Sequence, residues 1–465
     1  MENPSAPLSL GEKISYGLGD TASNLYFKFF EVFLVYYYTD IFGLNPAAMG
    51  TMFLVANLWD AVNDPLMGAI ADRTNTRKGK YRPYLLWFAI PYGLTGWLIF
   101  ANFGFLTDPG MKLAYAYATF ILFKMVYTAI NVPYSAMMGV ISPDAEDRQE
   151  LGRFRFLGAF GGGFLVFLSV RPLVEFLGKG DESFGFQLTM GIFGVLSVIC
   201  FFICYKMTKE RVIPQVNEGT VGLGEDLGLL CKNTPWVIMF IAGILTLTNV
   251  VLRGSVTIHY CEYHLGWGSD KVLWWMDITT LFLSSGTLGF IAGCYMTKWV
   301  LSRFTKKNAL ITLTLLNAVG IFTFFIVPPE ATMTLFALNL ICNLVAGPTP
   351  AIVWAMYTDV ADYGEWRFGR RATGLVFSAA QFAQKMGITI AGSAAGYLLA
   401  GFGYIANQEQ TPEALLGIRI IFCILPGVLA LANGIILIFY PLSQAQTQTI
   451  QAELAVTRAR NDSSP

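Results

Sequence analysis

The sequence has little charge and little histidine. Charged residues make up 13% of the 465 residues, against about 25% in an ordinary soluble domain. Basic and acidic residues balance at 31 each, which excludes a nucleic-acid binder that works through excess positive charge. The two histidines stand beside no plausible nucleophile, and no metal-ligand set is evident. We therefore expect neither an enzyme nor a bound cofactor.

The sequence also lacks a disulfide framework and a cleavable leader. Its seven cysteines are odd in number and scattered, and none has CxxC or zinc-ligand spacing. We interpret them as small apolar packing residues. The first residues, MENPSAPLSLGEK, show no basic segment followed by an apolar core. We therefore expect no cleaved signal peptide, and the first apolar segment serves as an internal signal.

Apolar residues are abundant, at 54% hydrophobic and 15% aromatic. At about 20 residues per span, twelve transmembrane helices need roughly 240 residues, which matches this content. The sequence predicts an all-α membrane protein. Apolar runs between Gly, Pro and charged residues give twelve spans, at residues 17–39, 46–70, 84–105, 111–139, 155–177, 187–206, 235–262, 272–300, 309–327, 333–357, 373–402 and 416–440.

The charges in the loops predict the orientation. Loops after the even-numbered spans carry basic clusters, whereas the opposite loops hold at most one Lys each. The positive-inside rule makes the basic loops cytoplasmic, and an even number of spans places both termini inside. The basic residues are Arg73, Arg77, Lys78, Lys80 and Arg82, then Arg148 and Arg153, then Lys206, Lys209, Arg211 and Lys232, then Arg303, Lys306 and Lys307, then Arg367, Arg370 and Arg371.

The longest polar stretch divides the chain into two halves of six spans. We expect a first bundle at 1–207, a cytoplasmic loop at 208–234, a second bundle at 235–441 and a cytoplasmic tail at 442–465. Two related halves of this kind are typical of secondary transporters.

The most informative buried charges lie in the second span, LVANLWDAVNDPLMGAIADR. Asp60 and Asp64 are four residues apart, so both carboxylates share a helix face, with Asn63 beside them. Charges at this depth are costly unless they are paired or functional. Two carboxylates and an amide oxygen are suited to Na⁺ or to a bound proton, although a structural link to cytoplasmic arginines is the alternative. Pro65 predicts a break in this helix.

The fourth span, FILFKMVYTAINVPYS, carries a polar stripe at helical spacing. Thr128 offers one more oxygen to the cation, and Asn131 offers a hydrogen bond to a hydroxylated ligand. Tyr127 and Tyr134 are candidates to stack on a sugar ring. Polar packing between helices is the alternative for the whole stripe.

The first span adds a second polar face. Asp20 and Asn24 pair an acceptor with a donor, which is what a sugar hydroxyl requires. Lys28 and Glu31 continue around the helix, and their i,i+3 spacing also allows them simply to neutralise each other.

Three residues of the second half complete the candidate site. Arg253 and Lys385 are cations within apolar spans, able to bind sugar oxygens, the two aspartates or an anionic ligand. Snorkelling to an interface is the alternative for Arg253, whereas Lys385 has uncharged residues for ten or more positions on either side. Trp354 is a further aromatic candidate for stacking on the sugar.

Charged residues at the cytoplasmic ends form a candidate gate. Ion pairs between the two halves would hold the outward-open state and break when the inner face opens, and solvated charge is the alternative. The residues are Asp72, Arg73, Lys80 and Arg82 in the first half, and Asp359, Asp362, Glu365, Arg370 and Arg371 in the second.

Several motifs, in order, resemble the glycoside–pentoside–hexuronide:cation symporters, a branch of the major facilitator superfamily. They are YYYTDIFGL, LWDAVNDPLMGAIADRT, GKYRPYLLW, INVPYSAM, DVADYGEW and QTPEALLGIR, and the likeness covers residues 10–442. The resemblance implies the major facilitator fold in a bacterial inner membrane, and a monomer that binds sugar and a monovalent cation together and works by alternating access.

The resemblance also assigns roles to residues. It implies that Asp60, Asn63, Asp64 and Thr128 hold the coupling ion, either Na⁺ or H⁺. Lys385 matches the family's lysine in helix eleven. Arg155 matches an arginine in helix five, which places it at the substrate.

The chain departs from the melibiose carriers of this family at five positions. Ser23-Asn24, Asn131, Ser135 and Pro350 replace their Lys-Asp pair, aspartate and two tryptophans, so the resemblance implies no intact galactoside site. Asp20, in a GDxAxN motif, is similar to glucuronide and xyloside carriers.

Loss of two acids, with Arg155, Arg253, Lys28 and Lys385 retained, favours an anionic sugar such as a hexuronide or a sulfonated sugar. A neutral glycoside stays open. A sodium-coupled lysolipid carrier of the same superfamily is the alternative, and it would need a cleft open to lipid.

Overall fold

A computed structural model of the protein describes residues 8–142, 144–211, 228, 230–268, 271–273, 276–368 and 373–462. These residues form two compact units. Unit 1 comprises Met1–Asn217, Cys261–Ser284 and Ala395–Ala414, and unit 2 comprises Glu218–Tyr260, Ser285–Ala394 and Leu415–Pro465. The first unit thus includes two segments, 261–284 and 395–414, that the sequence assigned to the second bundle.

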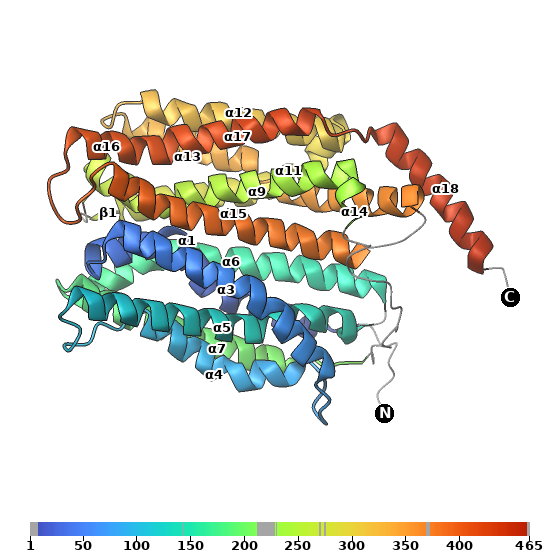
Figure 1. Cartoon of the computed structure of the whole chain (residues 1–465), viewed down its shortest axis with the longest axis horizontal. Coiled ribbons are helices and arrows are strands. Elements are labelled where there is room, and N and C mark those ends of the chain that lie inside the picture. Colours follow the sequence, from blue (N-terminus) through green and yellow to red (C-terminus); the bar gives the residue numbers. More distant parts are fainter. Residues whose placement is uncertain are drawn as a thin grey trace. The chain divides into compact units, whose positions relative to one another are not determined.

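Helices account for nearly all of the described structure (Figure 1). The first half has α1 (Leu10–Val32), α2 (Leu34–Tyr36), the π-helix η1 (Tyr37–Ile41), α3 (Pro46–Arg73), α4 (Arg82–Leu98), α5 (Pro109–Ile141), α6 (Ala145–Gly178) and α7 (Glu182–Met207).

The second half has α9 (Thr234–Ser255), α10 (Thr257–His259), η2 (Tyr260–His264), α11 (Ile278–Arg303), α12 (Lys306–Ile326), α13 (Thr332–Ala346), α14 (Thr349–Phe368), α15 (Thr373–Gly401), α16 (Pro412–Arg419), η3 (Ile420–Ile424), α17 (Leu425–Ile438) and α18 (Gln444–Asp462). Two short antiparallel strands, β1 (Lys271–Leu273) and β2 (Met276–Asp277), precede α11.

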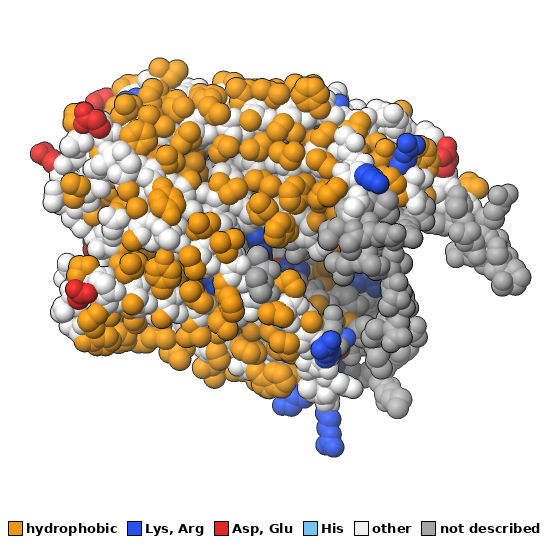
Figure 2. All heavy atoms as spheres, viewed as in Figure 1, with side chains coloured by type: hydrophobic (Ala, Val, Ile, Leu, Met, Phe, Trp, Pro, Cys, Tyr) orange, Lys and Arg blue, Asp and Glu red, His pale blue; other side chains and the backbone are white. Residues whose placement is uncertain are grey.

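All twelve expected spans overlap helices, but the strands β1 and β2 occupy the start of the expected span 272–300, and α4 ends at Leu98, within the expected span 84–105. Eight of the described helices are long and apolar enough to cross a membrane. Apolar side chains cover most of the visible face, and charged side chains gather mainly at its two ends (Figure 2). The fold is therefore that of an all-α membrane protein.

The expected break at Pro65 is wrong, because α3 runs without interruption from Pro46 to Arg73. Proline removes one backbone donor, but a transmembrane helix tolerates it when neighbouring groups satisfy the freed carbonyl. The continuity of α3 keeps Asp60 and Asp64 on one helix face.

Local signals explain several helix starts. Ser9 and Glu12 form a reciprocal capping box at α1. Asn45 caps α3 directly before Pro46, and Asp108 and Asp181 cap α5 and α7. Each side-chain oxygen accepts hydrogen bonds from backbone amides that lack a partner in the first turn.

In unit 1, Tyr26 of α1 fills the space between α4 and α7. Its hydroxyl donates to the carbonyl oxygens of Gly93 and Met190, each at 3.1 Å. A Cβ at Gly96 would lie 2.3 Å from the Tyr26 ring. Because lipid is as apolar as the helix surface, close packing and polar contacts of this kind hold membrane helices together.

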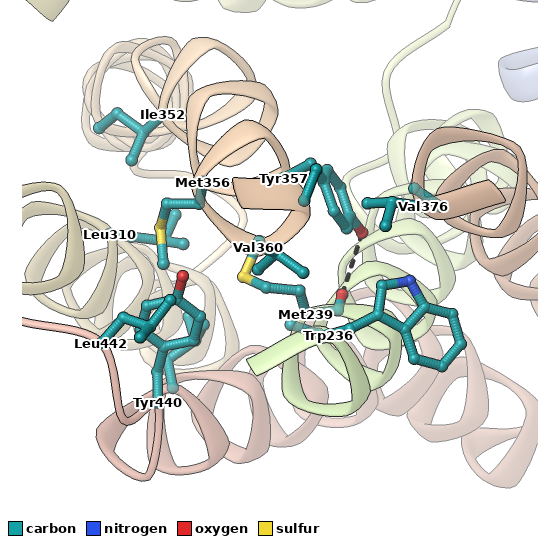
Figure 3. Packing of buried hydrophobic residues seen from close by; sticks show 14 of the residues in the cluster. Trp236, Met239, Leu310, Ile352, Met356, Tyr357, Val360, Val376, Tyr440 and Leu442 are labelled. Atoms are coloured by element: carbon teal, nitrogen blue, oxygen red, sulfur yellow. Dashed lines mark hydrogen bonds between the residues drawn. The ribbon is translucent and has the colours of Figure 1, made fainter. Parts of the chain in front are cut away.

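Unit 2 has its own core of buried apolar residues (Figure 3). Trp236 and Met239 of α9 pack there with Tyr357 of α14. The Tyr357 hydroxyl donates to the Met239 carbonyl oxygen at 3.0 Å, which satisfies a buried polar group within the core. Leu442 belongs to the same cluster, so the chain just before α18 is anchored there.

Candidate functional site

The predicted cation site is a row of polar side chains where α3 packs against α5. On α3, Asn57, Asp60 and Asp64 are three and four residues apart, so they share one face. On α5, Lys124 and Thr128 are four apart and face the same row. The Thr128 hydroxyl donates to Asp64 at 2.9 Å and lies 3.3 Å from Asp60.

Lys124 provides a cation that the sequence interpretation omitted. Its ammonium lies 3.0 Å from Asp60 Oδ2 and 2.9 Å from Asn57 Oδ1. The Asp60 side chain is 5% exposed and that of Lys124 18%. A buried carboxylate needs such a partner, because removing a charge from water is costly. The pair of aspartates therefore already has one positive charge beside it.

Asn63, the other predicted ligand of the cation, lies on α3 next to Asp64. Its side-chain nitrogen is buried and has no hydrogen-bond partner in the described part of the chain. A buried amide nitrogen without a partner is costly.

The predicted substrate residues Asp20 and Arg155 are partners. Arg155 Nε donates to Asp20 Oδ2 at 2.5 Å, and its Nη2 lies 3.4 Å from Oδ1. Arg155 also stacks on Tyr134, with the guanidinium carbon 5.0 Å from the ring centre. Tyr134 is fully buried and donates to the carbonyl oxygen of Tyr16. The hydrogen bond to Tyr16 therefore fixes the Tyr134 ring on which the Arg155 guanidinium stacks.

Close contact of α1 with α6 brings these two residues together. A Cβ at Gly158 would lie 2.1 Å from the Gly17 carbonyl oxygen, and one at Gly162 would lie 2.9 Å from the Thr21 carbonyl oxygen. Gly158 and Gly162 form a GxxxG pair, which permits backbones to approach closely. Thr21 donates to the Gly158 carbonyl oxygen at 3.0 Å across the same contact.

Other polar residues of unit 1 bind one another. Asn131 accepts from Ser23 at 2.8 Å and donates to the Tyr127 carbonyl oxygen at 3.2 Å. Asn24 donates to the backbone of Asp20 at 2.9 Å. Lys28 and Glu31 form an ion pair at 2.6 Å, so the expected possibility of mutual neutralisation describes their arrangement.

In unit 2, Trp354 lines a cavity of about 240 Å³. Its ring stacks on Phe377, with ring centres 5.7 Å apart. The cavity lining also includes the amide side chains of Asn249, Asn317, Gln384 and Asn433, and none of the described residues that line it is charged. The side-chain oxygen of Asn433 is buried without a partner in the described structure.

The two cations of unit 2 differ in their surroundings. The Arg253 guanidinium lies between Phe324 and Phe422, at 4.5 and 4.6 Å from the ring centres. It is thus held by aromatic faces of its own unit. Lys385 is half-buried on α15, and its backbone carbonyl accepts from Thr389.

Comparisons with known proteins decide the family. The sequence profile of the family described as MFS/sugar transport protein matches residues 15–444. The chain belongs to this family. It is a multi-pass membrane transporter of the major facilitator superfamily, and not an enzyme.

Three curated relatives align with this MFS sugar transporter over nearly its whole length. YagG of Escherichia coli (strain K12), a proposed glycoside/cation symporter, is 38% identical over 97% of this chain and 96% of its own. The isoprimeverose transporter of Lactiplantibacillus pentosus is 31% identical, covering 94% and 90%. The glucuronide carrier protein homolog of E. coli (strain K12) is 30% identical, covering 95% and 94%.

A solved structure agrees on the fold. The D-xylose-proton symporter superposes with a TM-score of 0.64 at 14% identity, covering 91% of this chain and 96% of its own. This likeness supports the major facilitator fold for the MFS sugar transporter.

Three of the predicted gating residues of the transporter have partners within their own units. In unit 1, backbone amides of Lys80 and Arg82 donate to Glu210, each at 2.7 Å, and Arg82 Nη2 donates to the Tyr205 carbonyl oxygen at 2.8 Å. In unit 2, buried Asp359 pairs with Lys306 at 2.7 Å.

Of the other predicted gating residues, three have described side chains and three do not. Arg73 is exposed in the last turn of α3, and Asp362 and Glu365 are half-buried on α14. The side chain of Asp72 and the residues Arg370 and Arg371 lie outside the described structure.

Sequence reasoning missed a second charged cluster in the transporter. Arg171 of α6 binds Glu262 at 2.7 Å and also Asp277. Nearby, Asp40 accepts from the hydroxyls of Tyr263 and Tyr404, the latter at 2.5 Å. Burial, followed by the Asp40 charge, raises the pKa of Tyr263 to about 12, so its phenol keeps the proton that it donates.

Simple spacing could have found Lys124, because it lies one helical turn before Thr128. The partners of Arg171 are about 100 residues away in sequence, so no local sequence pattern predicts that they bind it.

Proposed function

We propose that this protein imports a neutral glycoside together with a monovalent cation, by alternating access. The family and the proposed activity of its relative YagG support sugar:cation symport. The observation that carries the choice of a neutral sugar is charge pairing, because two of the membrane-depth cations that favoured an anionic ligand already have carboxylate partners.

Those two partners change the charge available to a ligand. Arg155 is paired with Asp20, and Lys28 with Glu31. A carboxylate or sulfonate ligand would have to compete with Asp20 for the guanidinium. A neutral hydroxyl avoids this competition, because it donates to the carboxylate and accepts from the guanidinium. The Asp20–Arg155 pair is therefore suited to sugar hydroxyls.

The charge-free cavity in unit 2 supports the same choice. Trp354 offers an aromatic face for the apolar side of a sugar ring, and the amide side chains donate to and accept from hydroxyl groups. Mostly apolar walls with a few convergent polar groups are usual in small-molecule sites. One relative is named for isoprimeverose and another for a glucuronide, so their names leave both neutral and anionic sugars open, and the charge pairing carries the choice.

Coupling follows from the two aspartates of α3. A cation that neutralises the row at Asp60 and Asp64 lowers the cost of a conformational change in the loaded carrier. A ligand shifts such an equilibrium only by binding the two states differently. We therefore assign the coupling step to Asp60, Asp64 and Thr128.

Uptake into membrane vesicles tests this function. Vesicles receive a labelled neutral xyloside or a labelled glucuronide, with an imposed Na⁺ gradient or, separately, a proton gradient. We expect the xyloside to accumulate and the glucuronide to remain outside. Vesicles with the variant Asp20→Asn serve as the matched control and should not accumulate sugar. Accumulation of the glucuronide alone would overturn the neutral assignment, and uptake of neither sugar would contradict sugar symport.

A further inference from the structure

We propose that Lys124 is a built-in cation that makes the α3–α5 site insensitive to Na⁺ and Li⁺. The ammonium lies among the oxygen atoms that a sodium ion would need, 3.0 Å from Asp60 and 2.9 Å from Asn57. This inference rests on the proposed symport, and it narrows the choice of coupling ion.

The oxygen atoms that a metal ion would need already have a partner. A metal cation binds through several oxygen lone pairs at once. Here Asp60 Oδ2 and Asn57 Oδ1 are occupied by the ammonium of Lys124. The Thr128 hydroxyl points its hydrogen at Asp64, at 2.9 Å. Its hydrogen is thus used by Asp64 while its lone pairs stay available, so it is the Asp60 and Asn57 oxygen atoms that Lys124 withholds from a metal ion.

The positive charge of Lys124 also opposes a second cation. The two aspartates carry two negative charges, and Lys124 supplies one positive charge in contact with Asp60. A sodium ion at the same aspartate would lie beside an ammonium, and the two like charges would repel strongly in this poorly hydrated place. Without Lys124, the same two carboxylates would attract a small cation.

Contacts with α3 and α5 hold Lys124 in place. Lysine is long and flexible, so the position of its ammonium depends on its partners. Asn57 and Asp60 bind it from α3, and the Phe120 ring, one turn back on α5, lies 5.9 Å from Nζ. The side chain is only 18% exposed. Moving it away would leave Asp60 buried without its partner, which is unfavourable.

Thermal unfolding of the purified full-length protein in detergent tests the proposal. The melting temperature is measured in NaCl, LiCl, KCl and choline chloride at equal ionic strength. A cation that binds only the folded state raises the melting temperature. For the natural protein we expect the same melting temperature in all four salts. For Lys124→Ala we expect a rise in NaCl and LiCl alone.

Two further variants make the result specific. When Lys124→Ala is combined with Asp60→Asn, the rise of the melting temperature in NaCl should disappear, because the vacated site has lost a carboxylate. Lys112→Ala, on the same helix, removes a lysine that binds the Phe42 carbonyl oxygen. It should respond to the four salts as the natural protein does. A sodium-specific rise in the natural protein, or its absence in a folded Lys124→Ala, would overturn the proposal.

A binding readout covers the case in which Lys124→Ala does not fold. Sugar affinity of the natural protein is then compared in NaCl and choline chloride. Coupled ligands commonly change each other's affinity by about 5- to 150-fold, so equal affinities support the proposal and a tenfold gain in NaCl overturns it. Failure of the proposed function gives a different result, because no sugar would then accumulate under any gradient, whereas the melting temperatures would still report on Na⁺.

Discussion

The carboxylate of Asp20 on α1 is bound by the guanidinium of Arg155 on α6, with Arg155 Nε 2.5 Å from Asp20 Oδ2. Both residues are largely buried, and Tyr134 lies beneath the guanidinium. The two helices meet through glycine, so the pair is fixed by backbone contact as well as by charge. The pair therefore offers a ligand the hydrogen-bond acceptors of the Asp20 carboxylate and the N–H donors of the Arg155 guanidinium at one place.

Arg155→Lys should weaken sugar binding by at least about tenfold, which corresponds to about 1.4 kcal/mol. Lysine keeps the charge but loses the planar fork that binds Asp20 and stacks on Tyr134. Isothermal titration of the purified protein with the transported glycoside measures the effect. Arg153→Lys, at an exposed position of the same helix, is the control and should bind normally. Unchanged affinity in Arg155→Lys would remove Arg155 from the site.

Gly158→Ala should lower the free energy of unfolding by about 1–3 kcal/mol, the usual cost of overpacking. The added methyl group would lie 2.1 Å from the Gly17 carbonyl oxygen, so α1 and α6 must separate. Gly161→Ala is the matched control, because a Cβ there meets no atom within 4 Å. Gly158→Ala should therefore melt at a lower temperature than Gly161→Ala. Equal values would show that the α1–α6 contact is looser than described.

Asp64→Asn should abolish concentrative uptake and leave folding and membrane insertion intact. Asparagine retains an oxygen for the Thr128 hydroxyl, but it removes the charge that a coupling cation must neutralise. Gradient-driven uptake in vesicles gives the measurement, and the amount of inserted protein gives the control for folding.

Asp181→Asn provides a comparison outside the site. Asp181 caps α7 by accepting from the Phe184 amide, and asparagine is an equally good cap. Its uptake should match that of the natural protein. Normal concentrative uptake by Asp64→Asn would refute the assignment of the coupling step.

Much of the fold could be predicted from the sequence, because hydrophobic runs of about 20 residues report directly on membrane spans. Asp60 and Asp64 were also predictable as a pair, since helical spacing fixes which side chains share a face, whereas Thr128, on another helix, was joined to them by the family resemblance. The α3–α5 contact does bring them together.

Pairing was harder to predict than position. Lys124 was visible in the sequence, but nothing local indicated that it would bind Asp60 on another helix. In the same way, Arg155 looked like a free positive charge until its contact with Asp20 was known. The expectation of an anionic sugar depended on counting charges without their partners. Periodicity describes one helix at a time, whereas net charge in a site depends on which helices touch.

Arg171→Gln should lower the free energy of unfolding by about 3–5 kcal/mol, the usual cost of breaking a buried ion pair from one side. Arg171 on α6 binds Glu262 and Asp277, and the Asp277 side chain is 5% exposed. Without the guanidinium, two carboxylates remain close together with no cation between them. The melting temperature of the purified variant measures this loss.

The partners of Arg171 provide the controls. Arg171→Gln combined with Asp277→Asn removes one of the two stranded charges and should recover part of the lost melting temperature. Lys13→Gln breaks a more exposed ion pair, with Glu150, and such pairs contribute little. If Arg171→Gln melts no lower than Lys13→Gln, Arg171 does not hold the segment 261–284 against α6. If Arg171→Gln is destabilised but its combination with Asp277→Asn is not, the lowered melting temperature comes from the unpaired carboxylates and not from the missing bulk of the arginine side chain.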